Sequence, residues 1–132
     1  MGRVCAVGRV CAVTSAGRRD RALSIYEAAV SLSGSDVERK AQALYGVAQT
    51  AYQCDDDKTV MAVVPEILRL RPVREVWVIP HALLVLGRAQ NRQGMKDEAK
   101  RSLKQALSYE DYDWEMNVRG RVERELEKLE SK

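Results

Sequence analysis

A run of large, small and turn residues between positions 80 and 107 constrains the fold of this chain more than any other feature. The segment reads PHALLVLGRAQNRQGMKDEAKRSLKQAL. The residues that define this pattern are Leu83, Leu86, Gly87, Gly94, Ala99, Leu103 and Ala106. Apolar residues at three- and four-residue steps form one helix face. Gly87 has no Cβ and lets a second helix lie against the first, while Gly94 is suited to the turn between them. The segment therefore predicts two antiparallel helices that cross closely at Ala99.

The same order of residues recurs twice upstream. Gly17, Ala22, Tyr26 and Ala29 repeat the offsets of the second helix of the pair. Leu44-Tyr45-Gly46 corresponds to Val85-Leu86-Gly87 of the later segment. A motif that recurs along a chain is typical of stacked helical hairpins, in which each hairpin buries its apolar face against the next.

Helical periodicity and capping residues predict seven helices, at about 3–14, 18–31, 36–53, 57–70, 78–93, 96–108 and 113–130. Ser35 or Asp36 is expected to cap the third, Asp57 the fourth, and Asp111 or Asp113 the seventh. An apolar stripe on the last helix is expected to face the core, and it consists of Trp114, Val118, Val122, Leu126 and Leu129. Gly120 weakens this helix, and close approach to a neighbouring helix is the expected reason for its presence.

These features resemble the tetratricopeptide repeat, although the spacing of Gly46 and Gly87 exceeds the usual period of about 34 residues. The resemblance implies an all-α, right-handed superhelix formed by a single domain, 1–132. Three hairpins are expected at about 3–31, 36–70 and 78–108, with a capping helix at 113–130.

Residues 77–130 also resemble the C-terminal end of the tetratricopeptide repeat protein 39 family, which includes fungal inclusion-body-clearance relatives. The resembling features are Val78-Ile79-Pro80, Leu86-Gly87, Gly94, Glu98-Ala99, Tyr112-Asp113-Trp114-Glu115 and Arg119 or Arg121. Such proteins are much longer than 132 residues. The resemblance implies intracellular scaffolding, linked to lipid handling and protein quality control.

The tetratricopeptide resemblance implies a non-catalytic module that binds a protein or peptide segment in the groove lined by the first helix of each hairpin. The expected groove residues are Lys40, Val47, His81, Leu84, Arg88, Asn91 and Arg92. This set is apolar at one end and basic at the other, so it predicts a partner with an apolar stretch and an acidic end. Arg88 and Arg92 lie one helical turn apart and are suited to a shared carboxylate. The alternative is that they are surface charges, or that they pair with Glu110 or Asp111.

Other classes of function have less support in the sequence. A net charge of +3 is too small to indicate nucleic-acid binding, and no apolar run reaches the length of a membrane span. The chain contains no recognisable phosphate loop or nucleophile motif, so we expect neither enzyme activity nor a cofactor. The acidic run at 55–57 is expected to cap a helix rather than bind a cation. Three cysteines without CxxC spacing are expected to be free, and a reactive thiol at Cys54 is the remaining enzymatic alternative.

The segment 1–19 carries a tandem GRVCAV and basic residues but no acidic residue. We interpret it as the first helix of a repeat in a cytoplasmic protein, and a mitochondrial presequence is the alternative. A truncated first repeat would expose an apolar face, so self-association is the alternative to partner binding.

Overall fold

The structure, a computed structural model, describes residues 24, 27–32, 34–112 and 114–130. Its helices are α3 (Val37–Gln53), α4 (Asp57–Leu70), α5 (Val78–Arg92), α6 (Lys96–Leu107) and α7 (Glu115–Glu130). Residues 27–32 are also helical, and no strand occurs among the described residues. The all-α prediction is therefore confirmed for this part of the chain. The helix expected at 3–14 and most of the one expected at 18–31 lie outside the described residues.

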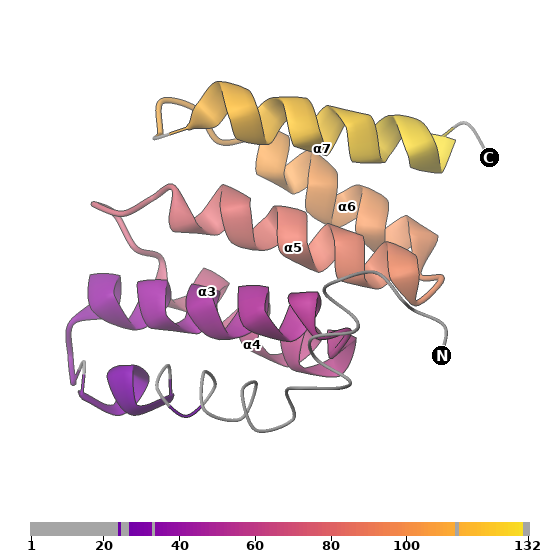
Figure 1. Ribbon diagram of the computed structural model, residues 1–132. Coiled ribbons are helices and arrows are strands. Elements are labelled where there is room, and N and C mark those ends of the chain that lie inside the picture. The colour runs from indigo at the N-terminus through magenta and orange to yellow at the C-terminus, as the bar shows by residue number, and fades with distance from the viewer. Residues whose placement is uncertain (1–23, 25–26, 33, 113, 131–132) are drawn as a thin grey trace.

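The helices form two layers. α3 packs against α4, and α5 packs against α6, as two antiparallel hairpins (Figure 1). α3, α5 and α7 lie side by side in the order α3–α5–α7, and all three begin at the same end of the stack. α4 and α6 form the second layer behind them. This arrangement places the starts of α3, α5 and α7 close enough for their side chains to meet.

The α5–α6 hairpin has the close crossing that the sequence predicted. A Cβ added at Gly87 would lie 2.7 Å from both Cγ and Cδ2 of Leu103, so only glycine fits there without a shift. Ala99 and Leu103 have no exposed surface. Gly94 makes the turn between the two helices with a φ of +82°, which is a conformation that glycine adopts at low cost.

Polar side chains cap two of the helices, one of them as expected. Asp36 caps α3 by accepting a hydrogen bond from the backbone N–H of Arg39 at 3.2 Å. The prediction that Asp57 caps α4 is wrong, because the cap is Asp56. One oxygen of Asp56 accepts from the Thr59 N–H at 3.3 Å, and the other accepts from the Thr59 hydroxyl at 2.7 Å. Asp57 is thus available for a different contact.

The apolar stripe of α7 is confirmed in four of its five positions. Its buried members are Val118, Val122, Leu126 and Leu129. Trp114 was expected to complete this stripe, and that prediction is wrong, because Trp114 precedes α7 and is 64% exposed. The explanation offered for Gly120 is also wrong. A Cβ at this position would meet only the side chain of Arg124, at 3.9 Å, and no neighbouring helix.

A buried carboxylate holds the connection between α4 and α5. Glu38, in the first turn of α3, is 9% exposed and accepts three backbone N–H bonds from this connection. The donors are Val73 at 3.0 Å, Arg74 at 3.2 Å and Glu75 at 2.8 Å. The bond from the Glu75 N–H is the largest influence on the pKa of Glu38, and together these bonds lower the pKa despite the opposing effect of burial. Glu38 therefore ties the start of α5 to the start of α3.

We expect Glu38→Gln to reduce the acid sensitivity of folding. A carboxyl whose pKa is lowered in the folded state stabilises the fold above its unfolded pKa, and loses that effect as the pH falls through the folded value. Glutamine keeps one acceptor oxygen and cannot bind all three donors in the same way. The variant should be less stable than wild type at pH 7, and the difference should shrink as the pH falls below the ordinary value near 4.5. Urea midpoints at pH 7 and pH 3 measure this, and a constant difference would contradict it.

Candidate functional site

Aromatic side chains gather where α5 and α7 begin, beside the middle of α3. We call this group the aromatic cluster, and it consists of Tyr45, Trp77, His81, Tyr112 and Trp114. The rings of Tyr45, Trp77, Trp114 and Tyr112 lie edge-on to His81, with centroids 5.9, 5.2, 6.1 and 6.5 Å away. Trp77 also meets Trp114 at 5.8 Å and Tyr45 at 5.8 Å. Edge-to-face aromatic pairs stabilise one another by about 0.5–1.5 kcal/mol each, so the rings hold each other in place.

Trp114 is the exposed member of the aromatic cluster, and its backbone is left-handed. Its φ is +63°, a region in which bulky side chains are strained. Such strain persists only where the surroundings impose it, and it concentrates at binding and switch sites. Trp114 is 64% exposed although it packs against Trp77 and His81. An indole held rigidly in contact with solvent is thus the most prominent chemical feature of this end of the stack.

Tyr112 is the buried member of the aromatic cluster, and its ring contact is with His81. The side chain is 9% exposed, and its hydroxyl forms no hydrogen bond within the described residues. Burial raises the pKa of Tyr112, the charge of Glu115 raises it further, and the charge of Arg119 acts in the opposite direction. The tyrosine is therefore neutral across the physiological range and contributes an apolar surface to the cluster.

Positive charge adjoins the aromatic cluster. Burial raises the pKa of Tyr45, while the charges of Arg121 on α7 and Arg88 on α5 act to lower it, so both guanidinium groups are within electrostatic range of this ring. Arg88 donates to Glu125 of α7 at 3.2 Å. Arg121 is exposed and forms no ion pair with any other described residue. Arg121 is consequently the guanidinium beside the cluster that is available to an anionic partner.

Arg92 belongs to a different contact at the opposite end of α5. Its Nε donates to both oxygens of Asp57, at 3.2 and 3.0 Å, and its Nη2 makes a further short contact with Asp57. Arg92 also pairs with Asp55 at 3.1 Å, and its Cζ lies 4.2 Å from the centre of the Tyr52 ring. Gln93 donates to Asp57 at 2.7 Å. Burial would raise the pKa of Asp57, but the hydrogen bonds from Arg92 and Gln93 and the charge of Arg92 lower it.

The structure therefore does not bring Arg88 and Arg92 together on one carboxylate. Each pairs within the chain, Arg88 with Glu125 and Arg92 with Asp57, and the two partners lie on different helices. The alternative in which these arginines pair with Glu110 or Asp111 is wrong, because their acidic partners are Glu125, Asp55 and Asp57. A helical spacing places two residues on one face but does not determine which neighbouring helix each side chain reaches.

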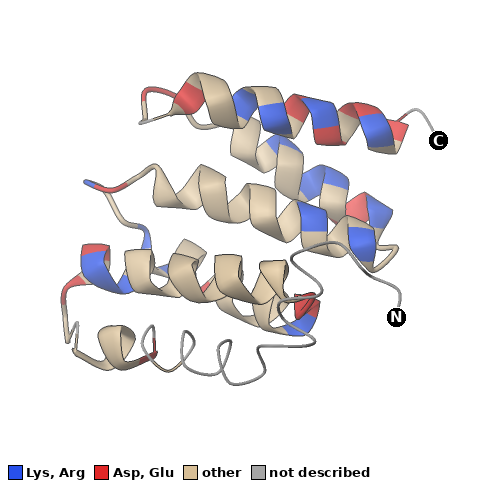
Figure 2. Ribbon diagram, viewed as in Figure 1, with Lys and Arg blue, Asp and Glu red and all other residues tan. Residues whose placement is uncertain are grey.

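The remaining expected groove residues differ in how much surface they present. Val47 and Leu84 are each 5% exposed, so they offer little area to a partner. Lys40, His81 and Asn91 are half-buried, and His81 lies at the centre of the aromatic cluster. Lys40 and Val47 belong to α3, and the other three belong to α5. Both helices lie in the layer formed by α3, α5 and α7. Charged residues are few over the first half of α5, and basic residues occur towards its end (Figure 2).

Sequence reasoning found His81 but missed the other members of the aromatic cluster as site residues. Trp77 and Trp114 are 37 positions apart in the chain, and no periodic pattern joins them. The two tryptophans share one sequence feature, which is that each immediately precedes a helix, α5 for Trp77 and α7 for Trp114. That signal has meaning only once α5 and α7 are known to be neighbours.

The acidic run and Cys54 have structural roles. Asp56 caps α4, and Asp55 and Asp57 pair with Arg92. No group of three or more ligating side chains in the described ranges is arranged to hold a metal ion. Cys54 is disulfide-bonded. This overturns the expectation that Cys54 is free and removes its thiol as an enzymatic alternative, because a disulfide sulfur is not the nucleophile that a thiolate is. Cys5 and Cys11 lie outside the described residues.

Within the part of the chain that the structure describes, no helix combines the length and the apolar character needed to cross a membrane. Comparison of the chain with protein-family models, with curated proteins and with solved structures finds no match.

Proposed function

We propose that this protein is a non-catalytic interaction module of the tetratricopeptide type, which binds a segment of another protein across α3, α5 and α7. The observation that carries the proposal is the aromatic cluster, with the exposed indole of Trp114 resting on Trp77 and His81. Tryptophan and arginine dominate the binding energy of protein interfaces, where they anchor the partner near the centre of the contact.

The partner segment carries an apolar side chain followed by a carboxylate. The apolar group packs on Trp114 and Trp77. The carboxylate reaches Arg121, whose charge acts on Tyr45 and which has no ion-pair partner among the described residues. Arginine suits this role because its planar guanidinium can bind both oxygens of a carboxylate. Arg92 has no part in this contact, because it pairs with Asp57.

Selection of a displayed library of random linear peptides on the protein tests the proposal, with tryptophan fluorescence as the readout. The chain has two tryptophans, and both belong to the aromatic cluster, so emission reports directly on that site. We expect selected peptides to share an apolar residue followed by Asp or Glu, and to change the emission on binding. Trp114→Ala should weaken binding, read by calorimetry, at least tenfold, which corresponds to about 1.4 kcal/mol.

Met116→Ala is the matched control. Met116 is 88% exposed and lies two residues beyond Trp114, but it makes no ring contact. This variant should bind the selected peptides as wild type does. Arg121→Glu should weaken the binding of peptides that carry Asp or Glu. It should weaken less the binding of the same peptides in which Asn or Gln replaces the acidic residue. Peptides that bind Trp114→Ala with unchanged affinity would contradict the proposal.

Self-association is the second candidate function, and it corresponds to a structural fragment of a larger scaffold. Leu32, Val73 and Met116 are 85%, 79% and 88% exposed, and large apolar side chains at a surface favour contact with a second copy. Light scattering of the wild-type protein over a range of concentrations separates the two functions. A mass that stays at 14.9 kDa argues against self-association.

A further inference from the structure

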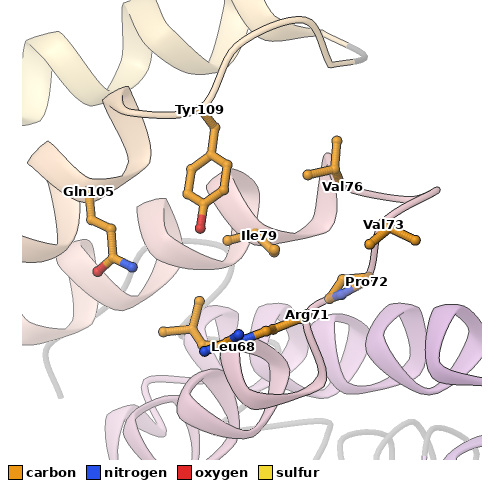
Figure 3. A pocket seen from close by; sticks show the side chains of 8 residues that line it. All are labelled: Leu68, Arg71, Pro72, Val73, Val76, Ile79, Gln105 and Tyr109. Atoms are coloured by element: carbon orange, nitrogen blue, oxygen red, sulfur yellow. The ribbon is translucent and has the colours of Figure 1, made fainter.

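A pocket of about 470 Å³ lies between the end of α4 and the end of α6, and none of its lining residues belongs to the aromatic cluster. The end of α4, the α4–α5 connection, the first turn of α5 and the end of α6 surround it (Figure 3). Its apolar lining consists of Leu68, Pro72, Val73, Val76 and Ile79. Volumes of about 300–1,000 Å³ are typical of small-molecule sites, which combine an apolar lining with a few polar groups.

Three polar side chains complete the lining, namely Arg71, Gln105 and Tyr109. The Tyr109 hydroxyl points into the space between Gln105 and Ile79, and the Arg71 side chain runs along the edge towards Leu68 (Figure 3). Arg71 is exposed and forms no ion pair with the rest of the described chain. The pocket thus has one positive group, two neutral hydrogen-bonding groups and an apolar floor.

The backbone conformation at Arg71 is one that arginine does not favour. Arg71 ends α4 in the left-handed conformation, with φ +51° and ψ +59°. Glycine is the usual residue at such a helix end because it adopts this conformation without strain. A long charged side chain that is kept at a strained position on the edge of a pocket fits a binding role.

Charges around the pocket leave the Arg71 guanidinium as its anion-binding group. The N–H groups of Val73, Arg74 and Glu75 are already bound by Glu38. At the end of α6, the carbonyls of Leu107 and Tyr109 accept hydrogen bonds from Arg119 at 2.8 and 3.1 Å. These bonds offset the negative end of the α6 dipole, which would otherwise disfavour an anion at this place.

We propose that this pocket binds a compact organic carboxylate. The carboxylate pairs with Arg71, the apolar body packs against Leu68, Val76 and Ile79, and Gln105 and Tyr109 supply further hydrogen bonds. A guanidinium recognises a carboxylate through two parallel hydrogen bonds, and an adjoining apolar wall selects for the hydrocarbon part of the ligand. The pocket shares no lining residue with the aromatic cluster, so it stands or fails independently of the proposed peptide binding.

The test is a titration of ¹⁵N-labelled protein with 4-phenylbutyrate, followed by amide chemical shifts. We expect saturable shifts at residues 71–79 and 105–109, and no change at the indole N–H group of Trp114. The uncharged 4-phenylbutyramide should bind at least tenfold more weakly. Arg71→Gly should weaken the binding of 4-phenylbutyrate at least tenfold. The Tm of this variant should equal or exceed that of wild type, because glycine adopts the left-handed conformation without strain.

Arg69→Gln serves as the matched control, since Arg69 is an exposed arginine in the last turn of α4 that does not line the pocket. This variant should bind the probe as wild type does, whereas Arg71→Gln should not. Equal affinity for the carboxylate and the amide would overturn the proposal. So would undiminished binding by Arg71→Gly, shifts confined to the tryptophan indoles, or the absence of saturable shifts at millimolar probe.

Discussion

Replacing Asp57 with alanine is expected to lower the free energy of unfolding by about 2–4 kcal/mol. The Asp57 side chain is 3% exposed, and it binds Arg92 through several hydrogen bonds and Gln93 through one. Removing one member of a buried ion pair costs about 3–5 kcal/mol because the other charge loses its partner. We set the expected cost lower because the Arg92 side chain is 35% exposed and water can solvate it in part. Chemical denaturation at pH 7 measures the difference.

Asp55→Asn is the control for this prediction, because asparagine tolerates the left-handed backbone at this position, where φ is +61°. Asp55 also pairs with Arg92, but its side chain is 42% exposed, so its loss should cost less than about 1 kcal/mol. A double-mutant cycle between Asp57→Ala and Arg92→Ala isolates the direct interaction. The pKa of Asp57 is lowered in the fold, so its contribution is present above the unfolded pKa and is lost as the pH falls through the folded value. A cost for Asp57→Ala as small as that for Asp55→Asn would contradict the structure.

Gly87→Ala should destabilise the fold by up to about 2 kcal/mol, although alanine is the better helix former. The new Cβ would lie 2.7 Å from Cγ and Cδ2 of Leu103, which is itself fully buried. Overpacking a core costs about 1–3 kcal/mol, and the gain in helix propensity offsets only about 1 kcal/mol of this. The midpoint of thermal unfolding should fall accordingly.

Gly120→Ala makes the same chemical change without the clash. Its Cβ would meet only the side chain of Arg124, at 3.9 Å. The variant should therefore stabilise the protein by about 0.5–1 kcal/mol through helix propensity alone. The difference between the two glycine variants isolates the steric effect of the α5–α6 crossing. If both variants moved the unfolding midpoint in the same direction, the close approach at Gly87 would be refuted.

Local sequence signals were sufficient for the helices of the described region. The expected span 57–70 agrees with α4, and 36–53 and 78–93 differ from α3 and α5 by one residue at one end. Periodicity, capping residues and turn glycines act over a few residues, so they are visible without tertiary information. Gly87 and Gly94 also have the roles that the sequence predicted, because both depend on the packing of two helices that follow each other directly in the chain.

Errors in the prediction concentrate where an element meets a neighbour that is distant in sequence. Arg88 and Arg92 share a helix face, yet one reaches α7 and the other reaches the start of α4. Trp114 matches the apolar spacing of α7 but lies before that helix, exposed against Trp77. The partners of a side chain depend on the order in which the helices stack and on how far each is shifted along its neighbour. Residue spacing within one helix predicts neither of these.

By itself, the sequence determined that the described chain is helical, where its helices begin and end, and which glycine permits the closest crossing. These properties follow from backbone propensity and local sterics. The tertiary structure alone decided the composition of the aromatic cluster, the pairing of Arg92 with Asp57, and the pocket at Arg71. Each of these features joins residues that are tens of positions apart in the sequence. Their side chains come within a few ångströms of each other only when the helices have stacked, so the sequence alone does not reveal the contacts.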